Sequence, residues 1–245
     1  MVEYTRTRSM LNEAPVRLVR TLLLAALITT TSSTTAQATR WVTYTEADGL
    51  PSHVVVDLVQ VPDGSVWAAT WNGIARLDRR QPAGHWEVVT DEVFDALAVD
   101  SNGIIWAGGK NGRLQWFDVH GDSLPTPVQL PQDASGDVTA LEPGPGGEMW
   151  IGQGSRAYGS RLRRWRPNPP GLDGWGVTGT IRHLDSTVLG HVWIGMDAGL
   201  GFSDGATLQL YPIGDKPADK DIHAVLVLCD DLFEDFLEHV QHVVC

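Results

Sequence analysis

Residues 94–109 read FDALAVDSNGIIWAGG, and three other stretches of the chain repeat this arrangement. Each copy has a tryptophan near its end, at steps of 39, 44 and 43 residues, and a glycine three positions before it. The pairs are Gly64 and Trp67, Gly103 and Trp106, Gly147 and Trp150, and Gly190 and Trp193. A period near 43 residues predicts one supersecondary unit per copy. Such units bury their apolar faces by packing side by side.

Each unit is predicted to contain three strands joined by two tight turns. The units open with an apolar residue at 55, 94, 138 and 181, and a leucine follows three positions later. Such short apolar runs broken by turn residues are typical of strands, and the repeated glycine suits the first turn because it tolerates positive φ. A second glycine begins the third strand in three units. In the third unit Gly159 takes this part after a connection longer by about three residues.

A fourth strand completes the first unit as HWEVVT (85–90), and the similar WVTYT (41–45) precedes that unit. We expect 41–45 to be a fourth strand that pairs with the last unit and closes a ring. Four strands per unit predict an all-β fold, a β-propeller of four-stranded blades over 39–228. About four full blades are expected, with a partial fifth that opens at Ile222.

The units resemble the two-component regulator propeller repeat, in which a Leu-x-x-Asp-x-x-Gly-x-apolar-Trp-x-Gly pattern recurs. VDSNGIIWAGG (99–109) matches this pattern, and DGLPS (48–52) matches the link between blades. The resemblance implies a periplasmic sensing domain found ahead of a membrane helix and a histidine kinase, with glycans or their fragments as ligands. The sequence departs from the pattern at Val61, Gly144 and Thr187, where the other units have no counterpart of Asp100.

The N-terminus indicates where the protein is located, and the net charge limits which partners are expected. Two arginines, an apolar run over 22–28 and a small-residue site at 36–38 predict a cleaved signal peptide over 1–38, and hence a periplasmic or secreted protein. That run is too short to cross a membrane. The whole chain has a net charge of −12, so nucleic acid is not an expected partner.

One basic stretch opposes this acidity and supplies the candidate ligand-binding residues. These are Arg156, Tyr158, Arg161, Arg163 and Trp165, in and after the longest second turn. Arginine forks and aromatic platforms suit an anionic sugar or another carboxylate. The alternative is a charged outer strand that discourages edge pairing.

The chain has none of the common catalytic motifs, so we expect a binding protein rather than an enzyme. An enzymatic alternative is a propeller lyase acting on a polysaccharide or lactone, and a third reading is a structural interaction module. A lyase would need a base, and five histidines are candidates: His53, His120, His183, His191 and His223. No cofactor is expected.

The tail after Leu228 departs from the repeat. Residues 230–245 have helical spacing, which leaves open a capping helix or a shifted reading frame. Cys229 and Cys245 could pair in an oxidising compartment, whereas their spacing matches no common zinc site. We therefore expect a small-molecule or oligosaccharide ligand, no metal, no transmitter domain in this chain, membrane attachment only through a further segment, and self-association through an open propeller edge. The expected ligand-facing loops are 46–53, 119–137, 153–160, 167–180 and 212–221.

Overall fold

The computed structural model describes most of the predicted propeller region. The described residues are 42–78, 84–118, 126–128, 130, 136–155, 159–211 and 222–225. The predicted signal peptide and the off-pattern tail lie outside them, as do Arg156, Tyr158 and His120.

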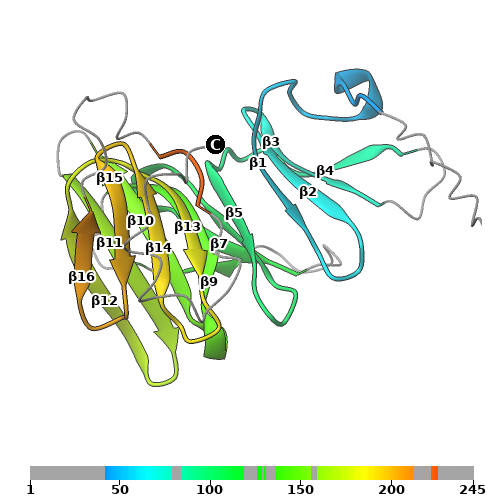
Figure 1. Cartoon of the computed structure of the whole chain (residues 1–245). Helices are drawn as coiled ribbons and strands as arrows, with labels where there is room; N and C mark the ends of the chain where they lie inside the picture. The colour runs from blue at the N-terminus through cyan, green and yellow to red at the C-terminus, as the bar shows by residue number, and fades with distance from the viewer. Residues whose placement is uncertain are drawn as a thin grey trace, which may run out of the picture. The chain divides into compact units, whose positions relative to one another are not determined.

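Within these described residues, sixteen strands form four antiparallel sheets, each built from four consecutive strands (Figure 1). Blade 1 consists of β1 (Val55–Gln60), β2 (Val66–Thr70), β3 (Gly73–Leu77) and β4 (Trp86–Thr90). Blade 2 consists of β5 (Ala96–Val99), β6 (Ile105–Gly108), β7 (Leu114–Phe117) and β8 (Thr126–Pro127). Blade 3 consists of β9 (Asp137–Pro143), β10 (Met149–Ser155), β11 (Gly159–Pro167) and β12 (Pro170–Val177). Blade 4 consists of β13 (Ile181–Ser186), β14 (Val192–Met196), β15 (Gly199–Ser203) and β16 (Leu208–Tyr211).

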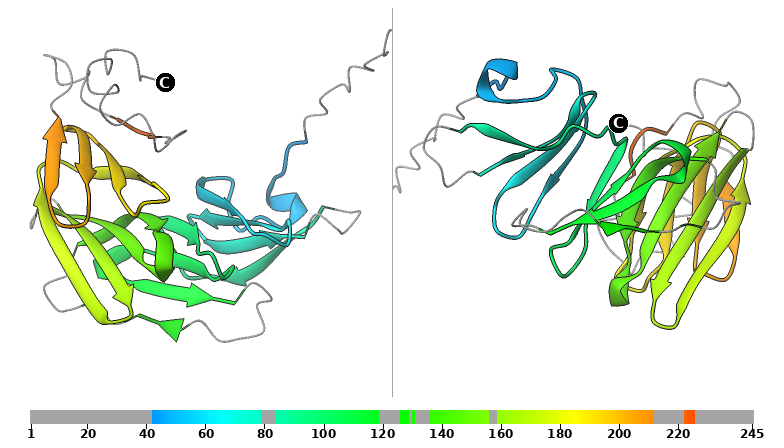
Figure 2. Two further views of the ribbon diagram at one scale, coloured as in Figure 1. Left: turned by 60° about the horizontal axis from the view of Figure 1, so that its bottom comes forward. Right: turned by 180° about the vertical axis from the view of Figure 1, so that it is seen from behind.

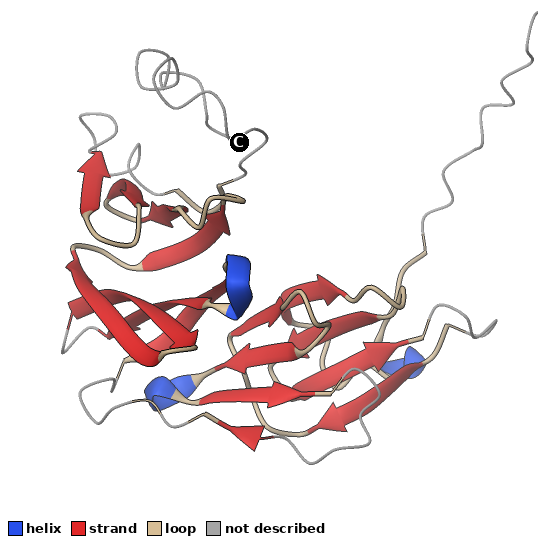
Figure 3. Ribbon diagram, turned by 90° about the horizontal axis from the view of Figure 1, so that it is seen from below, coloured by secondary structure: helices blue, strands red, loops and turns tan. Residues whose placement is uncertain are grey.

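The described helices are three single turns of 3-10 helix (Figure 3). They are η1 (Glu46–Asp48), η2 (Lys110–Gly112) and η3 (Pro145–Gly147). The blades follow one another in chain order (Figure 2), and the first strand of each blade contacts that of the next: β1 with β5, β5 with β9, and β9 with β13. The predicted four-stranded blades are therefore confirmed.

The repeated glycines form the turns that the sequence predicts. Gly64, Gly103, Gly147 and Gly190 have φ values of 88°, 80°, 82° and 85°. In blades 1, 2 and 4 the glycine N–H donates to the carbonyl three residues earlier, and that earlier residue donates to the carbonyl four residues ahead of it. This is a three-residue hairpin whose last position needs a left-handed backbone, which glycine adopts without strain.

The repeated tryptophans lie in the core, as their positions predict. Trp67 and Trp150 have no exposed surface, and Trp106 and Trp193 are buried. Trp67 packs with Phe94 and Leu97 of the next blade, and Trp150 packs with residues of blade 4. Large aromatic rings of this kind provide much of the apolar area that holds neighbouring blades together.

Asp100, which the other units lack, has a local structural role. Asp100 Oδ1 accepts the backbone N–H groups of Asn102 and Ile104 at 2.8 and 3.0 Å, and Oδ2 accepts the Trp106 indole N–H at 3.2 Å. Units 1 and 3 have valine or glycine at this position. There the buried indole N–H groups of Trp67 and Trp150 have no hydrogen-bond partner among the described residues.

We expect Asp100→Ala to lower the free energy of unfolding by about 2 kcal/mol, because it removes the acceptor for one indole and two backbone donors. The measurement is urea unfolding of the single variants and of a double-mutant cycle with Trp106→Phe. A coupling energy of about 1 kcal/mol between the two positions is expected. Strictly additive effects would show that the indole bond contributes nothing.

A second set of glycines lets the blades approach each other. Gly108, Gly152 and Gly195 follow their tryptophans by two positions, and each faces the opening residue of the next unit. An added Cβ would overlap Val138 Cγ1 at the first site and would lie 2.7 Å from Ile181 Cγ2 at the second. The glycine two positions after each of these tryptophans therefore makes room for the next blade.

The opening residue of the fifth unit occupies the same place as those of the complete blades. Ile222 N donates to Met196 O at 2.9 Å, as Val138 N donates to Gly109 O between blades 2 and 3. Ile222 and Val225 pack against Trp193, Leu200 and Phe202 of blade 4. The start of a fifth blade is thus present in the described part of the chain.

Two predictions about fourth strands and loops are wrong. Residues 42–45 form no strand, and each of the four described sheets has a fourth strand of its own. Instead Thr45 caps η1 and Tyr44 packs edge-on against Trp86 at 5.9 Å. The expected loop at 167–180 contains β12, which pairs with β11 along its whole length. The glycines and the proline of β12 suggested a loop, but such residues are also tolerated in an outer edge strand.

Candidate functional site

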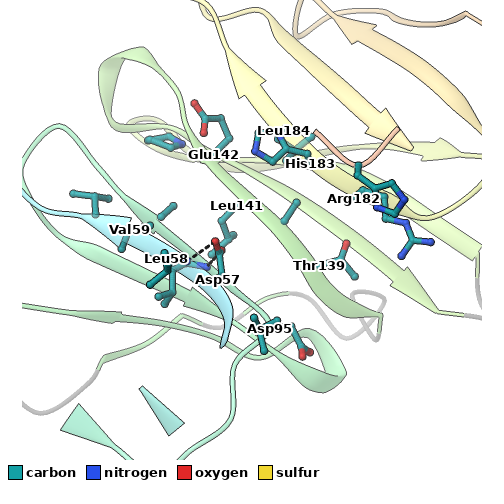
Figure 4. Close-up of a pocket in the computed structure, with 17 residues that line it drawn as sticks. Asp57, Leu58, Val59, Asp95, Thr139, Leu141, Glu142, Arg182, His183 and Leu184 are labelled. Atoms are coloured by element: carbon teal, nitrogen blue, oxygen red, sulfur yellow. Dashed lines mark hydrogen bonds between the residues drawn. The ribbon is translucent and has the colours of Figure 1, made fainter. Parts of the chain in front are cut away.

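A cavity of about 470 Å³ lies between the first strands of the four blades (Figure 4). Its walls come from β1, β5, β9 and β13, and His223 of the fifth unit completes them. The β1 wall is largely apolar, with Val56, Leu58 and Val59. The β9 and β13 walls carry Thr139, Glu142, Arg182 and His183. We call this cavity the first-strand pocket. Its volume is in the range of small-molecule sites.

The same position of each unit supplies a residue to this pocket. It is the residue after the opening one, and its members, which we call the bulge ring, are Val56, Asp95, Thr139, Arg182 and His223. In β1, β9 and β13 the pairing with the second strand skips this residue, so each forms a β-bulge. Asp95 N donates to Gly108 O, although Gly108 pairs with Ala96. A bulge re-aims its side chain, and bulges are common beside binding sites.

In β1 and β13 the residue after the bulge-ring residue has a different role, because it bonds to the following unit. Asp57 Oδ2 accepts the backbone N–H of Leu97 at 2.7 Å, which ties blade 1 to blade 2. His183 Nδ1 accepts the N–H of Val225 at 3.4 Å, which is the corresponding contact between blade 4 and the fifth unit. With Nδ1 as acceptor, neutral His183 carries its proton on Nε2. Asp57 and His183 therefore connect neighbouring units at the wall of the pocket.

Glu142 connects blades 3 and 4. Its Oε1 accepts the backbone N–H and the hydroxyl of Ser186 at 3.2 and 3.0 Å, and the hydroxyl also lies 2.8 Å from Pro143 O. Burial raises the pKa of Glu142 to about 7, against which the bonds from Ser186 act, while the negative charge of Asp185 adds to the rise. Burial likewise raises the pKa of Asp57, opposed by its bonds from Leu97 and Leu58.

Lysine neutralises the carboxylate of the bulge ring. Lys110 Nζ lies 2.9 Å from Asp95 Oδ2 and 3.2 Å from Asp137 Oδ2. Asp137 Oδ1 also accepts the backbone N–H of Asn111 at 3.0 Å. These carboxylates raise the pKa of Lys110, Asp95 foremost. The group joins η2 to β9 at one end of the pocket, where Figure 4 shows Asp95, Thr139 and Arg182 along one side and Val59 and Glu142 toward the other.

This set of groups suits a polar small molecule with an apolar face. Arg182 and the histidines can donate hydrogen bonds, Thr139 and the carboxyl groups can accept them, and Leu58 and Val59 can contact carbon atoms. No group of three or more potential metal-ligating side chains occurs among the described residues. Of the histidines considered as bases, His183 and His223 line the pocket. His53 pairs with Glu46 at 3.1 Å, and His191 packs against Phe202.

The described candidate residues of the arginine-rich stretch lie in different environments. Arg161 is exposed on β11, whereas Arg163 is buried, with 4% of its surface exposed. Trp165 packs against Trp106 of the preceding blade, with ring centroids 5.1 Å apart. A tryptophan used between blades offers little of its face to a ligand. Arg156 and Tyr158 lie outside the described residues, so that proposed site remains a prediction.

The neighbouring arginines of the same strand are engaged by β12. Arg164 donates to Asp173 Oδ2 at 2.9 Å and to Gly205 O at 3.0 Å, and its guanidinium lies over the rings of Trp150 and Trp175. Arg166 donates to Asp173 Oδ1 at 3.1 Å. The bonds to Asp173 lie within blade 3, and the bond to Gly205 ties that blade to blade 4. β11 lies between β10 and β12, so it is not the charged outer strand that the sequence offered as the alternative.

Sequence reasoning missed the bulge ring, except that it named His223 as a candidate base. Aligned by their opening residues, the units show Val, Asp, Thr, Arg and His at this position, which is more polar than a strand buried between blades requires. That change of residue type was the available signal. The bulge that turns these side chains into the pocket is visible only in the register of the strands.

Solved structures share this fold at low sequence identity. The extracellular domain of BT4673 from B. thetaiotaomicron, described as a one-component system, has a TM-score of 0.54 and 17% identity over 66% of this chain and 23% of its own. The extracellular domain of the hybrid two-component system BT3049 from the same organism has a TM-score of 0.54 and 15% identity over 71% and 24%. The WD40 β-propeller domain of Doa1 has a TM-score of 0.50 and 15% identity over 63% and 52%.

These likenesses show the fold, which is a β-propeller. The chain spans about a quarter of the length of the two extracellular domains. No family model matches the sequence, and no curated protein matches it. None of the helices in the described ranges is long and apolar enough to cross a membrane.

Proposed function

We propose that this chain is the ligand-binding propeller of an extracytoplasmic sensor and belongs to the input part of a two-component system. The observation that carries the proposal is the first-strand pocket, where bulges direct Thr139 and Arg182 toward one cavity. The likeness to extracellular domains of such systems supports the same reading. The ligand we propose is a sugar or a small oligosaccharide.

The geometry of the pocket favours ligand binding without catalysis. The carboxylates at the pocket wall accept hydrogen bonds from the protein itself: Asp57 from Leu58 and Leu97, and Glu142 from Ser186. They thereby fix the shape of the pocket between blades, which pre-organises it for a ligand. The lyase reading requires turnover, and the same binding experiment detects it as the appearance of a shortened product.

The test uses the purified full chain and calorimetric titration with glucose, galactose, cellobiose and oligogalacturonate. We expect saturable one-to-one binding to at least one of these sugars and no product. Val56→Trp places an indole in the pocket from a position that is already 41% exposed, so it should weaken binding by at least about tenfold with little effect on folding.

Val88→Trp is the matched control, because Val88 is 58% exposed on β4 and does not line the pocket. It should bind like the wild type. Equal binding by Val56→Trp and the wild type would remove the pocket as the site. Release of an unsaturated or hydrolysed product would favour the enzyme instead.

A further inference from the structure

The polarity of the bulge ring changes around the pocket. Arg182 and His223 occupy the ring position in adjacent units, blade 4 and the fifth unit. Thr139 precedes them in blade 3, and Asp95 with its lysine partner lies in blade 2. The basic side chains of the ring thus lie in two consecutive units, and the Thr139 hydroxyl lies in the unit before them.

The acidic groups of the pocket are occupied by the protein. Both Asp57 oxygens accept backbone N–H groups, at 2.8 and 2.7 Å. Asp95 is paired with Lys110, and Glu142 accepts two bonds from Ser186. Burial also raises the pKa of Glu142 to about 7, so this carboxyl is largely uncharged in mildly acidic solution. A carboxylate entering the pocket meets less negative charge than the number of acidic residues suggests.

Arg182 is placed to receive such a group. Its side chain lines the pocket and is 40% exposed, and its guanidinium lies 4.0 Å from Asp197 Oδ2. The other oxygen of Asp197 accepts the Thr180 backbone N–H at 2.6 Å, which fixes that carboxylate on the blade. A guanidinium binds a carboxylate through two parallel hydrogen bonds when both lie in one plane.

We infer that the first-strand pocket selects a sugar acid, a uronate, with the ligand carboxylate bound at Arg182 beside His223. The inference rests on the proposed function, which requires only that a sugar binds in this pocket. Thr139 is placed to bond a ring hydroxyl. Val56 and Leu58 on the opposite wall are placed to contact the apolar face of the sugar ring.

The test is calorimetric titration of the full chain at pH 6.5 with galacturonate and glucuronate, compared with their methyl esters and with galactose and glucose. We expect each free acid to bind at least about tenfold more tightly than its ester. Arg182→Gln should abolish that difference. Arg161→Gln, which alters an exposed arginine of β11 outside the pocket, should leave it unchanged.

The outcomes separate the inference from the proposed function. Neutral sugars that bind as tightly as the acids, with no effect of Arg182→Gln, would overturn the inference and leave the sensor proposal standing. Loss of acid binding in Arg161→Gln alone would move the site to β11 and overturn the inference. No binding of any tested sugar would count against both proposals.

Discussion

Gly73→Ala is expected to lower the free energy of unfolding by about 3 kcal/mol or more. Gly73 begins β3 with φ +123°, a backbone conformation that disfavours any residue with a Cβ. An added Cβ would overlap the carbonyl oxygen of Thr90 and would lie 2.9 Å from Asp91 Cα. These atoms belong to the backbone at the end of β4, so neither moves without disturbing the sheet.

Gly64→Ala is the matched control for this prediction. Gly64 also has a positive φ, +88°, but nothing lies within 4 Å of a Cβ built there. This variant should lose only about 1 kcal/mol, from backbone strain alone. The measurement is urea unfolding of the two variants and the wild type. Equal losses would show that the close approach of Thr90 has no energetic weight.

The sequence predicts the blades because its strongest signals are local. A glycine three residues before a tryptophan encodes one hairpin, and four copies encode four, so the strand order follows from chain order alone. The fourth strands are less visible. β12 runs through PGLDGWGV (170–177), whose glycines and proline are typical of loops, and its pairing comes from the long hairpin with β11. WVTYT (41–45) has the opposite character: its residues are strand-like, but 42–45 form no strand and Thr45 caps η1.

The candidate site could be predicted less well, for two physical reasons. A one-residue bulge reverses which side chains face the pocket, and nothing in an alternating pattern marks where it occurs. Arg182 therefore reads from sequence as an ordinary strand residue. Conversely, Trp165 beside five arginines suggests a ligand platform. Its contact with Trp106 depends on the packing of two blades, which no spacing within one unit reveals.

Contacts between units explain why the first strands are both structural and functional. The acceptors Asp57, Glu142 and His183 each take a backbone N–H from the following unit. All three line the pocket. Because burial raises the pKa of Asp57 and of Glu142, the fit between neighbouring blades depends on protonation as well as on apolar packing. Glu142 is the member for which this dependence should be largest.

The wild-type chain is expected to lose stability as the pH rises from about 4.5 to 7 through Glu142, by up to about 3 kcal/mol. Burial raises its pKa from 4.5 to about 7, so in this range the folded chain holds a proton that the unfolded chain has released. Stability falls with pH wherever the folded state binds more protons. The contribution is therefore fully present below pH 4.5 and is lost as the pH reaches 7, where the buried carboxyl ionises.

Glu142→Gln should remove this dependence, because the amide stays neutral and its oxygen still accepts from Ser186. The measurement is the unfolding midpoint of the full chain at half-unit steps from pH 5 to 8.5. The variant should exceed the wild type above pH 7, and the two curves should approach each other near pH 5. Glu87→Gln removes the same charge from an exposed position of β4 and should keep the wild-type slope. A Glu142→Gln curve that runs parallel to the wild type over the whole range would show that Glu142 does not take up this proton, and the tie between blades 3 and 4 would then be independent of pH.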